Sequence, residues 1–324
     1  MNIMRVPRLR ILVSCSLAAL GALSLVACGS PSSSSAGGSR LHIGSLVADT
    51  TVPYYAPMIA GEKQAAQEMG ADIDIQNGQG DLGKEIAIVQ QFITQKKDVL
   101  VLTASDSKGI APAVQLANAA GIPVIANNTV VDGADTVTYV GSDNVTYGHY
   151  LGKATCQVTG GKGNIGLILG LLGSSPEFDR LTGIQDELKA NCPGVKIVAQ
   201  ATASWDNAKA LAVGQDFLNR FPKGQLDAIL DEGPEGVAPA QYAKKNGRPE
   251  VKFIVGDIPQ AVATAIADGT IDIGVWQDPA EQGSKSVKDA INWVKGNKSA
   301  VPQPRDYSTN TLITKANLNT VKPY

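Results

Sequence analysis

The stretch DVLVLTASDSKGIAPAVQLANAAGIPVIANN, residues 98–128, holds two apolar runs with an alanine-rich segment between them. The runs VLVLT and PVIA lack the polar alternation of a half-exposed strand, so we expect both faces of each strand to be covered. The middle segment has good helix-forming residues and ends in glycine, which is typical of a helix and its C-terminal cap. Strand, helix and strand in this order predict a βαβ unit with parallel strands.

This alternation of strands and helices runs from residue 41 to about residue 315 and pauses only at residues 141–143. It predicts an α/β protein whose parallel sheets are covered by helices on both faces. The strands are too many for one comfortable open sheet, so the pattern favours two doubly wound domains. A single eight-stranded barrel is the alternative, although the short strand pair before Asp143 disturbs the regular count that a barrel needs.

The first 40 residues are unlike the rest. Arg5, Arg8 and Arg10 precede an apolar run, residues 11–27, that is shorter than the roughly 20 residues of a membrane-spanning helix. A basic head, a short apolar middle and small residues at the end make an export signal. The ending LVAC resembles the bacterial lipoprotein signal, which predicts a signal peptide of residues 1–27 and a lipid on Cys28. An ordinary signal with an incidental cysteine is the alternative. Residues 28–40, rich in serine and glycine, are expected to form a flexible tether.

Charge and cysteine usage limit the partners. The formal charge is −2, and the export signal removes three arginines and no acid, which leaves about −5. A mildly acidic surface has no electrostatic attraction for nucleic acid. Beyond Cys15 and Cys28, only Cys156 and Cys192 remain, and with two distant histidines they form no zinc-ligand spacing. We therefore expect no metal, no cofactor and no nucleic acid.

Polar and aromatic side chains follow nearly every predicted strand. Ligands of open parallel sheets bind beyond the carboxyl ends of the strands, so these residues are expected to converge. Acids, amides and an arginine suit the hydroxyls of a sugar or polyol, and flat aromatic rings suit its C–H faces. Each residue by itself is more often a helix cap or part of the core, so only the set is informative. The set is Asp49, Thr50, Tyr54, Tyr55, Ser105, Asp106, Asn127, Asn128, Ser174, Ser175, Asp179, Arg180, Trp205, Asp206, Asp231, Glu232, Asp257, Trp276, Gln277 and Asp278.

Catalytic motifs are scarce. The sequence has no nucleophile elbow, no phosphate loop of the Walker type and no zinc-protease motif. Gly78, Gly80 and Gly83 follow a strand and open a helix, as in a dinucleotide site, but no acid ends the next strand to bind a ribose hydroxyl. A turn and a helix start explain these glycines better. Asp231 and Glu232 form the one local acid pair that an enzyme could use.

Several stretches together resemble the ribose/galactose-type periplasmic sugar-binding proteins. They are IGSLVADTTVPYYAPMIAGEKQAAQEMGADI, GIPVIANN, YVGSDNVTYGHYLG, IVGDIPQAVATAIADG and VWQDPAEQGSKSV, and their order carries the likeness over nearly all of residues 41–315. The resemblance implies the type I binding-protein fold, with two doubly wound lobes, a hinge of three crossovers and a ligand in the cleft. We therefore expect one lobe of residues 41–142 and 278–308 and another of residues 143–277 and 309–324. Repressors of this fold begin with a DNA-binding motif, whereas here an export signal takes that place.

The resemblance also implies roles for individual residues. Tyr54 and Tyr55 match the aromatic pair that packs on the sugar, and Trp205 matches the aromatic wall of the second lobe. Arg180 and Asp257 match the residues that bond sugar hydroxyls. Gln277 matches the amide at the crossover. Together with the residues that follow strands, the expected ligand-binding set is Asp49, Tyr54, Tyr55, Asn128, Arg180, Trp205, Asp231, Asp257, Trp276 and Gln277.

Departures from the family pattern bear on the ligand. Val52 stands where ribose and galactose binders have a polar residue, and Asn128-Thr129 replaces an Asp-Arg pair. An Asn-Asp pair of the family is also missing, around residues 231–234. The stretch GVWQDPAEQG leans toward the rhamnose and autoinducer-type binders. We therefore expect a deoxysugar, a pentose or a linear polyol in place of ribose or galactose.

The resemblance implies a monomeric solute-binding lipoprotein of an ABC importer, which catalyses no reaction and hands a sugar or polyol to the permease subunits. It is expected on the outer face of the cell membrane, held by its lipid, or in the periplasm. An exported sensor for a signalling receptor and an exported sugar-modifying enzyme are the alternatives. If the chain crosses between lobes near Ser142, Cys156 and Cys192 lie on neighbouring elements away from the cleft. They are then expected to form a disulfide, with two free thiols as the alternative.

Overall fold

The structure is a computed structural model and describes residues 40–324. The predicted export signal, the predicted lipid on Cys28 and nearly all of the predicted tether lie outside the described residues. Among the helices of residues 40–324, none combines the length and the apolar character that crossing a lipid bilayer requires.

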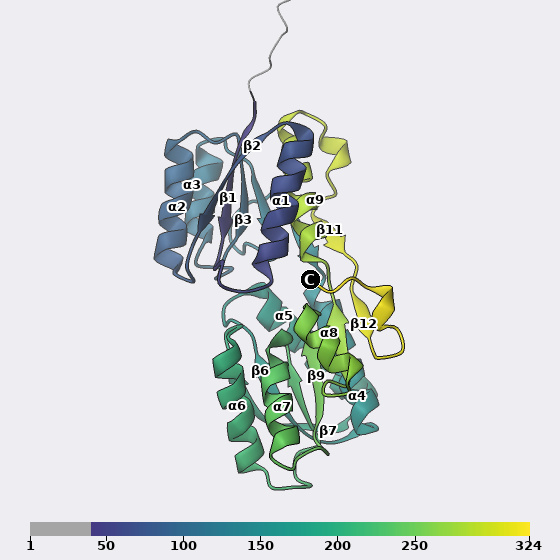
Figure 1. The fold of residues 1–324 in the computed structure, drawn as a ribbon. Helices are drawn as coiled ribbons and strands as arrows, with labels where there is room; N and C mark the ends of the chain where they lie inside the picture. The colour runs from purple at the N-terminus through teal and green to yellow at the C-terminus, as the bar shows by residue number, and fades with distance from the viewer. Residues whose placement is uncertain (1–39) are drawn as a thin grey trace, which may run out of the picture. The chain divides into compact units, whose positions relative to one another are not determined.

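The described chain forms two six-stranded sheets, shown in Figure 1. The first has the strand order β11-β5-β4-β3-β1-β2, and all its pairs are parallel. The second has the order β12-β10-β9-β8-β6-β7, and only β12 runs antiparallel to its neighbour. Two open sheets agree with the doubly wound fold and are incompatible with the barrel alternative.

We call each sheet with the helices packed on it a lobe. The first lobe consists of β1 (His42–Val47), α1 (Tyr55–Met69), β2 (Asp72–Asn77), α2 (Leu82–Thr94), β3 (Val99–Thr103), α3 (Ala111–Ala119), β4 (Val124–Asn127), β5 (Thr138–Ser142), α9 (Pro279–Val294) and β11 (Arg305–Ser308). The second lobe consists of α4 (Asn144–Thr159), β6 (Lys162–Leu169), α5 (Ser175–Asn191), β7 (Gly194–Thr202), α6 (Asn207–Arg220), β8 (Ala228–Asp231), α7 (Val237–Lys245), β9 (Lys252–Gly256), α8 (Gln260–Ala267), β10 (Ile273–Trp276) and β12 (Thr311–Ile313). Short 3-10 turns, Pro234–Gly236, Lys298–Ala300 and Leu318–Thr320, complete the list.

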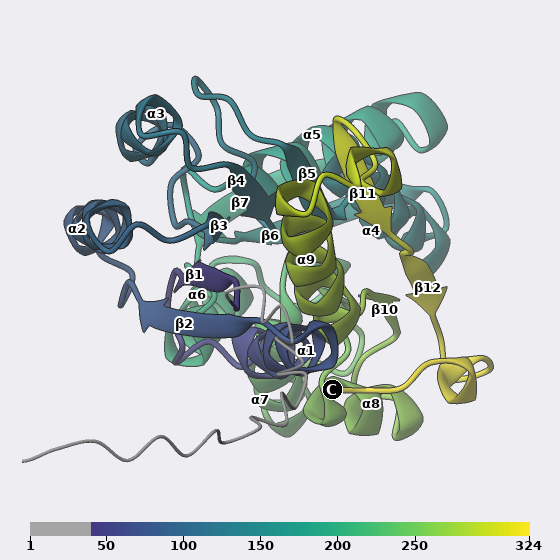
Figure 2. The ribbon, with the colours of Figure 1, turned by 90° about the horizontal axis from the view of Figure 1, so that it is seen from above.

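Strand β3 shows why the opening stretch of sequence decides the fold. All five of its residues are buried, and successive residues point to opposite faces of the sheet. Val99 and Val101 pack with α1 and α9, whereas Leu100 and Leu102 pack with α2 and α3. Figure 2 shows α1 and α9 side by side on one face of this sheet and α2 and α3 on the other. An apolar strand is stable here because water is excluded from both faces.

The second sheet repeats this layered design. Helices α4 and α5 cover one face through Leu151, Ile184 and Leu188. Helices α6, α7 and α8 cover the other through residues such as Phe217 and Val262. The two lobes therefore have separate cores of the same construction.

The chain passes between the sheets three times. It crosses after Ser142 at the end of β5, after Trp276 at the end of β10, and between β11 and β12. The first and second crossings follow predicted strands. Strand β11 was not predicted from the sequence, because RDYS has no apolar run and pairs only along one edge, with β5.

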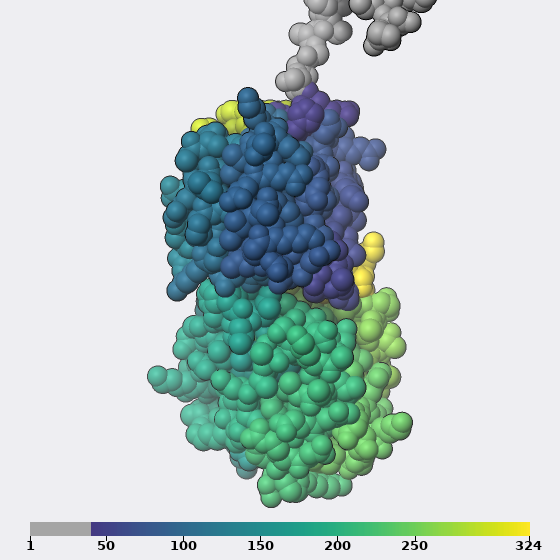
Figure 3. Space-filling view, turned by 90° about the vertical axis from the view of Figure 1, so that its left-hand side faces the viewer, coloured from purple at the N-terminus to yellow at the C-terminus, as the bar shows by residue number. Residues whose placement is uncertain are grey.

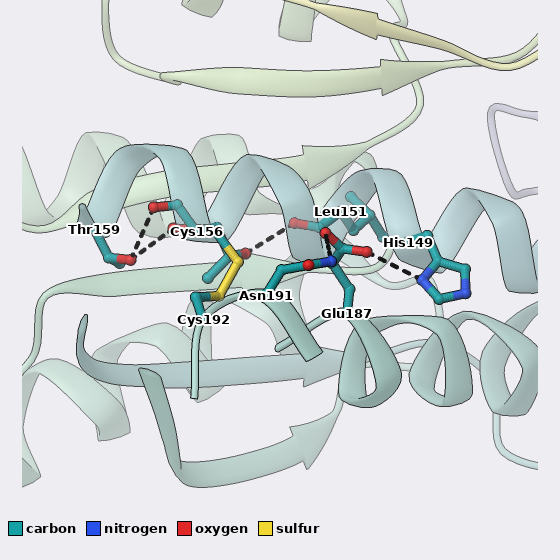
Figure 4. The surroundings of a disulfide bond; sticks show 8 residues. His149, Leu151, Cys156, Thr159, Glu187, Asn191 and Cys192 are labelled. Carbon is teal, nitrogen blue, oxygen red and sulfur yellow. Dashed lines mark hydrogen bonds and ion pairs between the residues drawn. A yellow bond between two sulfur atoms is a disulfide. The ribbon is translucent and has the colours of Figure 1, made fainter. Parts of the chain in front are cut away.

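A disulfide joins Cys156 and Cys192 within the second lobe (Figure 4). Cys156 lies in the last turns of α4, and Cys192 is the C-terminal cap of the neighbouring helix α5. The same two helices are linked by His149 and Glu187, whose Nδ1 and Oε2 atoms are 3.3 Å apart. The crosslink thus ties together two helices of one lobe and spans none of the three crossovers.

The glycines of residues 78–83 serve the turn before α2. A Cβ on Gly78 would lie 2.9 Å from the carbonyl oxygen of Ala48, so only glycine fits there. Asp81 caps α2 by accepting a hydrogen bond of 2.8 Å from the backbone N–H of Lys84. Close packing and a helix start therefore account for the glycine motif.

Candidate ligand-binding site

A cavity lies where the carboxyl ends of strands from both sheets meet. Every segment that lines it follows a strand or begins the next helix, as expected for open parallel sheets. The lining residues of the first lobe are Val52, Pro53, Tyr54, Tyr55, Ala104, Asn128 and Thr129. Those of the second lobe and its crossover are Leu171, Ser174, Pro176, Arg180, Trp205, Pro234, Glu235, Asp257 and Gln277.

The two lobes touch beside this cavity, and Figure 3 shows one face on which they meet. The backbone N–H of Ser175 donates to Oγ of Ser107 at 3.0 Å, and the backbone N–H of Val130 donates to Oγ of Ser175 at 2.8 Å. Ser107 also donates its N–H to the carbonyl of Gly173. The loop that starts α5 thus bonds to two loops of the first lobe.

The wall of the first lobe is aromatic and neutral. Tyr54 and Tyr55 are both buried and pack edge to face, with ring centroids 5.6 Å apart. The Tyr54 hydroxyl donates to Oε1 of Gln282 at 2.6 Å and accepts from Nδ2 of Asn128 at 3.2 Å. These bonds fix the ring of Tyr54, so it presents a rigid apolar surface to an occupant.

Arg180 is the charged centre of the opposite wall. It extends from α5, is only 2% exposed and lies over the ring of Tyr147, 4.0 Å from its centroid. Its Nε donates to Oδ1 of Asn144 at 3.2 Å, and its Nη1 donates to the backbone carbonyl of Glu232 at 2.6 Å. Trp205 lies on its other side, 5.6 Å from ring to guanidinium. Two hydrogen bonds and two aromatic rings hold the guanidinium in one orientation, which suits it to bind a ligand oxygen.

Asp257 lies close to Arg180 and is 5% exposed. Its Oδ1 accepts a hydrogen bond of 2.6 Å from Nε2 of Gln277 and lies 3.0 Å from the Tyr147 hydroxyl. Burial raises the pKa of Asp257, whereas the positive charge of Arg180 and these hydrogen bonds lower it. The carboxyl is thus prepared to accept hydrogen bonds from a ligand.

Hydrogen bonds connect the two walls through the crossovers. Gln282 at the start of α9 accepts from Tyr54 and donates Nε2 to Oε1 of Gln277 at 2.9 Å. Ser142, the last residue before the first crossover, donates to the same Oε1 at 2.6 Å. Through Gln277 the chain of bonds reaches Asp257. A ligand that moves either wall would therefore act on the hinge as well.

Three residues that line the cavity, one from the first lobe and two from the second, have a left-handed backbone. Asn128 has φ of 62°, Trp205 of 59° and Asp257 of 56°. Asn and Asp adopt this conformation at modest cost, but Trp rarely does. Strain at non-glycine positions is tolerated mainly where surrounding structure enforces it, and it gathers at functional sites. Its occurrence at three residues that line the cavity makes the cavity a candidate binding site.

Carboxyl groups are crowded on the wall of the second lobe. Asp231 is the last residue of β8 and Glu232 follows it, both buried, and Glu235 comes next on the one-turn helix Pro234–Gly236. Burial raises the pKa of Glu232 to about 8, opposed by the Gly170 N–H and by Arg180. Burial also raises the pKa values of Asp231 and Glu235, and the negative charge of Glu232 adds to the first shift and that of Asp231 to the second. Burial therefore favours the neutral form of all three acids.

Seven of the ten expected ligand-binding residues line the cavity: Tyr54, Tyr55, Asn128, Arg180, Trp205, Asp257 and Gln277. The structure places the other three elsewhere. Asp49 turns back to accept from the N–H and hydroxyl of Thr51. Asp231 lies behind the wall and accepts from the N–H of Gly233 at 3.0 Å. Trp276 is half-buried and packs against the core of the second lobe, and its indole N–H donates to the carbonyl of Lys322.

Strand geometry explains why Trp276 is not on the wall. It is the last residue of β10, so its side chain points to the opposite face from that of Gln277. Sequence reasoning missed Glu235, Gln282 and Tyr324, whose ring packs edge to face on Tyr54 at 6.0 Å. A proline at the start of a short helix, Pro234, was the only local sign of Glu235.

Comparison with known proteins gives the family. The sequence pattern of the periplasmic binding protein domain matches residues 43–298. The chain belongs to this family. The ribose import binding protein RbsB of Salmonella typhimurium is 27% identical over 255 residues, which cover 78% of this chain and 85% of that protein. The xylitol-binding protein of Mycolicibacterium smegmatis is 27% identical over 270 residues, which cover 79% of this chain and 76% of that protein.

A solved structure supports the same conclusion. The Caulobacter myo-inositol binding protein, determined with myo-inositol bound, superposes on this periplasmic binding protein with a TM-score of 0.81. The two are 26% identical, and the match covers 87% of this chain and 96% of the other. The family consists of solute-binding proteins, several of which bind sugars or polyols for import, and membership indicates an exported protein. The recognition made from the sequence is therefore confirmed at the level of the family and the fold.

Proposed function

We propose that this periplasmic binding protein captures a small sugar or polyol between its lobes and delivers it to the permease of an ABC importer. The observation that carries the proposal is the cavity itself. Aromatic rings of Tyr54 and Trp205 face it from opposite lobes, and Arg180 and Asp257 present charged hydrogen-bonding groups. This combination suits a molecule with apolar C–H faces and several hydroxyls. Binding through both lobes favours the closed arrangement over an open one.

The proposed ligand class is a pentose, a deoxysugar or a polyol. Val52 and Thr129 line the first-lobe wall at positions where the resemblance implies more polar residues in ribose and galactose binders, which supports a less polar face on the ligand. Two of the similar proteins described above bind xylitol and myo-inositol, which are both polyols. The leaning toward rhamnose-type binders rests on the stretch GVWQDPAEQG and is part of this proposal.

The direct test is a calorimetric titration of the purified protein with xylitol, myo-inositol, D-ribose and L-rhamnose. Tryptophan emission is followed in parallel. Trp205 lines the cavity and Trp276 does not, so Trp205→Phe should abolish the emission change while Trp276→Phe preserves it. An emission change that persists in Trp205→Phe and vanishes in Trp276→Phe would place the ligand elsewhere. Analysis of the recovered sugar shows whether any chemical conversion has occurred.

We also propose that the protein is held at the membrane by a lipid on Cys28. The ending Leu25-Val26-Ala27-Cys28 after a short apolar run supports this, and the serine-rich residues 29–39 supply a tether. The lobes would then reach a permease from one anchored end. Cys28→Ser is expected to move the protein from the membrane fraction to the soluble exported fraction. Unchanged fractionation would remove the anchor from the proposal.

A further inference from the structure

The second-lobe wall holds more carboxyl groups than positive charges, and this excess points to the ligand. We infer that the site selects sugars or polyols that carry a positively charged amino group, and that Glu235 binds this group. The inference rests on the proposed sugar-binding function and narrows its ligand class.

Glu235 contributes a buried carboxyl group to the cavity wall, and one of its oxygens has no hydrogen-bond partner in the described residues. It lines the cavity and is 3% exposed, yet its Oε2 has no hydrogen-bond partner among the described residues. Leaving a buried polar atom unpaired costs about 1–3 kcal/mol, so such an atom in a cavity wall indicates a missing partner. Gly233 separates this carboxyl from the Trp205 ring, because a Cβ there would collide with both. The carboxyl and an aromatic face are therefore neighbours.

The charges of the wall do not balance. Arg180 is the only basic residue among those that line the cavity, and it faces four buried carboxyl groups: Asp231, Glu232, Glu235 and Asp257. One guanidinium compensates one carboxylate. Buried charges are stable only when paired, so burial favours the neutral form of the remaining acids. Burial raises the pKa values of Asp231, Glu232 and Glu235, and the positive charge of Arg180 offsets this only in part.

An organic ammonium group fits this wall better than the other possible occupants. A metal ion is disfavoured, because no three acids, histidines or cysteines within residues 40–324 are grouped closely enough to hold one. A hydroxyl would meet a protonated Glu235 and gain a neutral hydrogen bond. An ammonium would instead meet a carboxylate, and a charged hydrogen bond is worth roughly twice as much. The nearby face of Trp205 adds a favourable surface for a cation.

Binding of an amine should release a proton. Glu235 faces Asp231 and Glu232 from the second sheet, Arg180 from α5, Asp257 after β9 and the hydroxyl of Tyr324. Burial and then the negative charge of Asp231 raise the pKa of Glu235, so a proton held here belongs to both carboxyl groups together. When an ammonium enters, the pair loses this proton to solvent and becomes the anionic partner of the ligand.

The test compares ligands that differ only in one group. Calorimetric titrations of the full chain use xylitol against 1-amino-1-deoxyxylitol, and myo-inositol against an amino-deoxyinositol. Each titration is run in two buffers of different ionisation enthalpy, which counts the protons released. We expect one amino compound to bind ten- to hundredfold more tightly than its neutral counterpart and to release about one proton.

Two variants of the same chemical change locate the effect. Glu235→Gln should abolish both the preference for the amine and the proton release, while a neutral polyol still binds. Glu62→Gln alters a buried glutamate of the first lobe that does not line the cavity, and it should keep both effects. The comparison of amino and neutral ligands on the unaltered chain tests the preference for an amine even if a variant fails to fold.

The outcomes separate the two proposals. If neutral polyols bind and the amino compounds bind equally or less tightly, the amine inference is wrong and the sugar-binding function remains. If amines bind tightly but Glu235→Gln keeps the full preference, Glu235 is not the partner and the inference fails at that residue. If neither class binds, the proposed function is wrong and this inference is wrong with it.

Discussion

The two lobes are built alike but face the cavity with opposite chemistry. Each has a six-stranded sheet between two layers of helices, and each contributes the segments that follow its strands. The wall of the first lobe contains only neutral residues, whereas that of the second contains Arg180, Glu235 and Asp257. The fold fixes where the walls stand, and the residues after each strand decide what they bind.

Buried acids occur in both lobes, and their partners differ. In the first lobe, Glu62 accepts from Ser45 at 2.8 Å and from Asn127 at 3.3 Å, and Glu85 accepts from the N–H of Ser105. In the second lobe, oxygens of Asp231, Glu232 and Glu235 have no partner within the described residues. Asp289 of α9 also has an oxygen without a partner in the described residues, but it does not line the cavity. Among these acids, Glu235 alone brings such an oxygen to the cavity wall.

The largest expected effect concerns stability, and it tests whether crosslink and cavity are independent. Replacing Cys156 and Cys192 with Ser opens a loop of 36 residues. Loop entropy predicts a loss of about 2–4 kcal/mol in the free energy of unfolding. Ligand affinity should be unchanged, because the disulfide does not touch the cavity wall. Urea unfolding and calorimetry check the two parts. A large loss of affinity would show that the crosslink positions the second-lobe wall.

The next effect tests the charged wall. Arg180→Met removes the guanidinium while keeping much of the packing on Tyr147. A charged hydrogen bond contributes roughly 1.5–3 kcal/mol, so the ligand affinity should fall about ten- to hundredfold. The affinity of Arg180→Lys should lie between those of the unaltered protein and Arg180→Met, because Lys keeps the charge but loses the forked geometry. The melting temperature of each variant is the control for folding. Unchanged affinity in Arg180→Met would mean that the wall does not bind the ligand.

A pH dependence tests the acids of the first lobe. Burial raises the pKa of Glu62 from 4.5 to about 7, although bonds from Ser45 and Asn127 lower it. A raised pKa means that the folded protein holds the proton more tightly than the unfolded chain. The stabilising contribution is therefore complete below about pH 4.5 and is lost as pH rises through about 7.

Glu62→Gln should flatten the dependence of unfolding free energy on pH in that window, by at most about 1.4 kcal/mol per pH unit. Urea titrations of both proteins at several pH values between 4 and 8 measure the difference. Other buried acids contribute equally to both proteins, so they cancel in the comparison. Parallel curves would show that Glu62 stays ionised in the fold.

The smallest effect tests the neutral wall. Tyr54→Phe keeps the ring and removes the hydroxyl that bonds Gln282 and Asn128. A neutral hydrogen bond contributes about 0.5–1.5 kcal/mol, so affinity should fall only about two- to tenfold. Calorimetry measures it beside Arg180→Met. If both variants lose the same affinity, the contrast between the walls has no energetic meaning.

The sequence by itself determined the alternation of strands and helices and the position of the strand ends. It therefore located Tyr54, Arg180, Trp205 and Asp257 near one site, because strand ends of parallel sheets converge wherever the sheet is built. It also separated the lobes near Ser142, where the apolar rhythm pauses. These features depend on local pattern, so they can be read residue by residue.

Only the tertiary structure decided which side chains face the cavity and which stay unpaired. Trp276 and Gln277 are adjacent in sequence, but the pleat of β10 turns one into the core and the other to the ligand side. Glu235 reaches the wall through a single turn of helix. Its charged neighbours are Asp231, Arg180 and Asp257, which come from three different elements and leave one of its oxygens without a hydrogen-bond donor among the described residues. Such burial and charge balance depend on groups brought together from distant positions, and no local pattern encodes them.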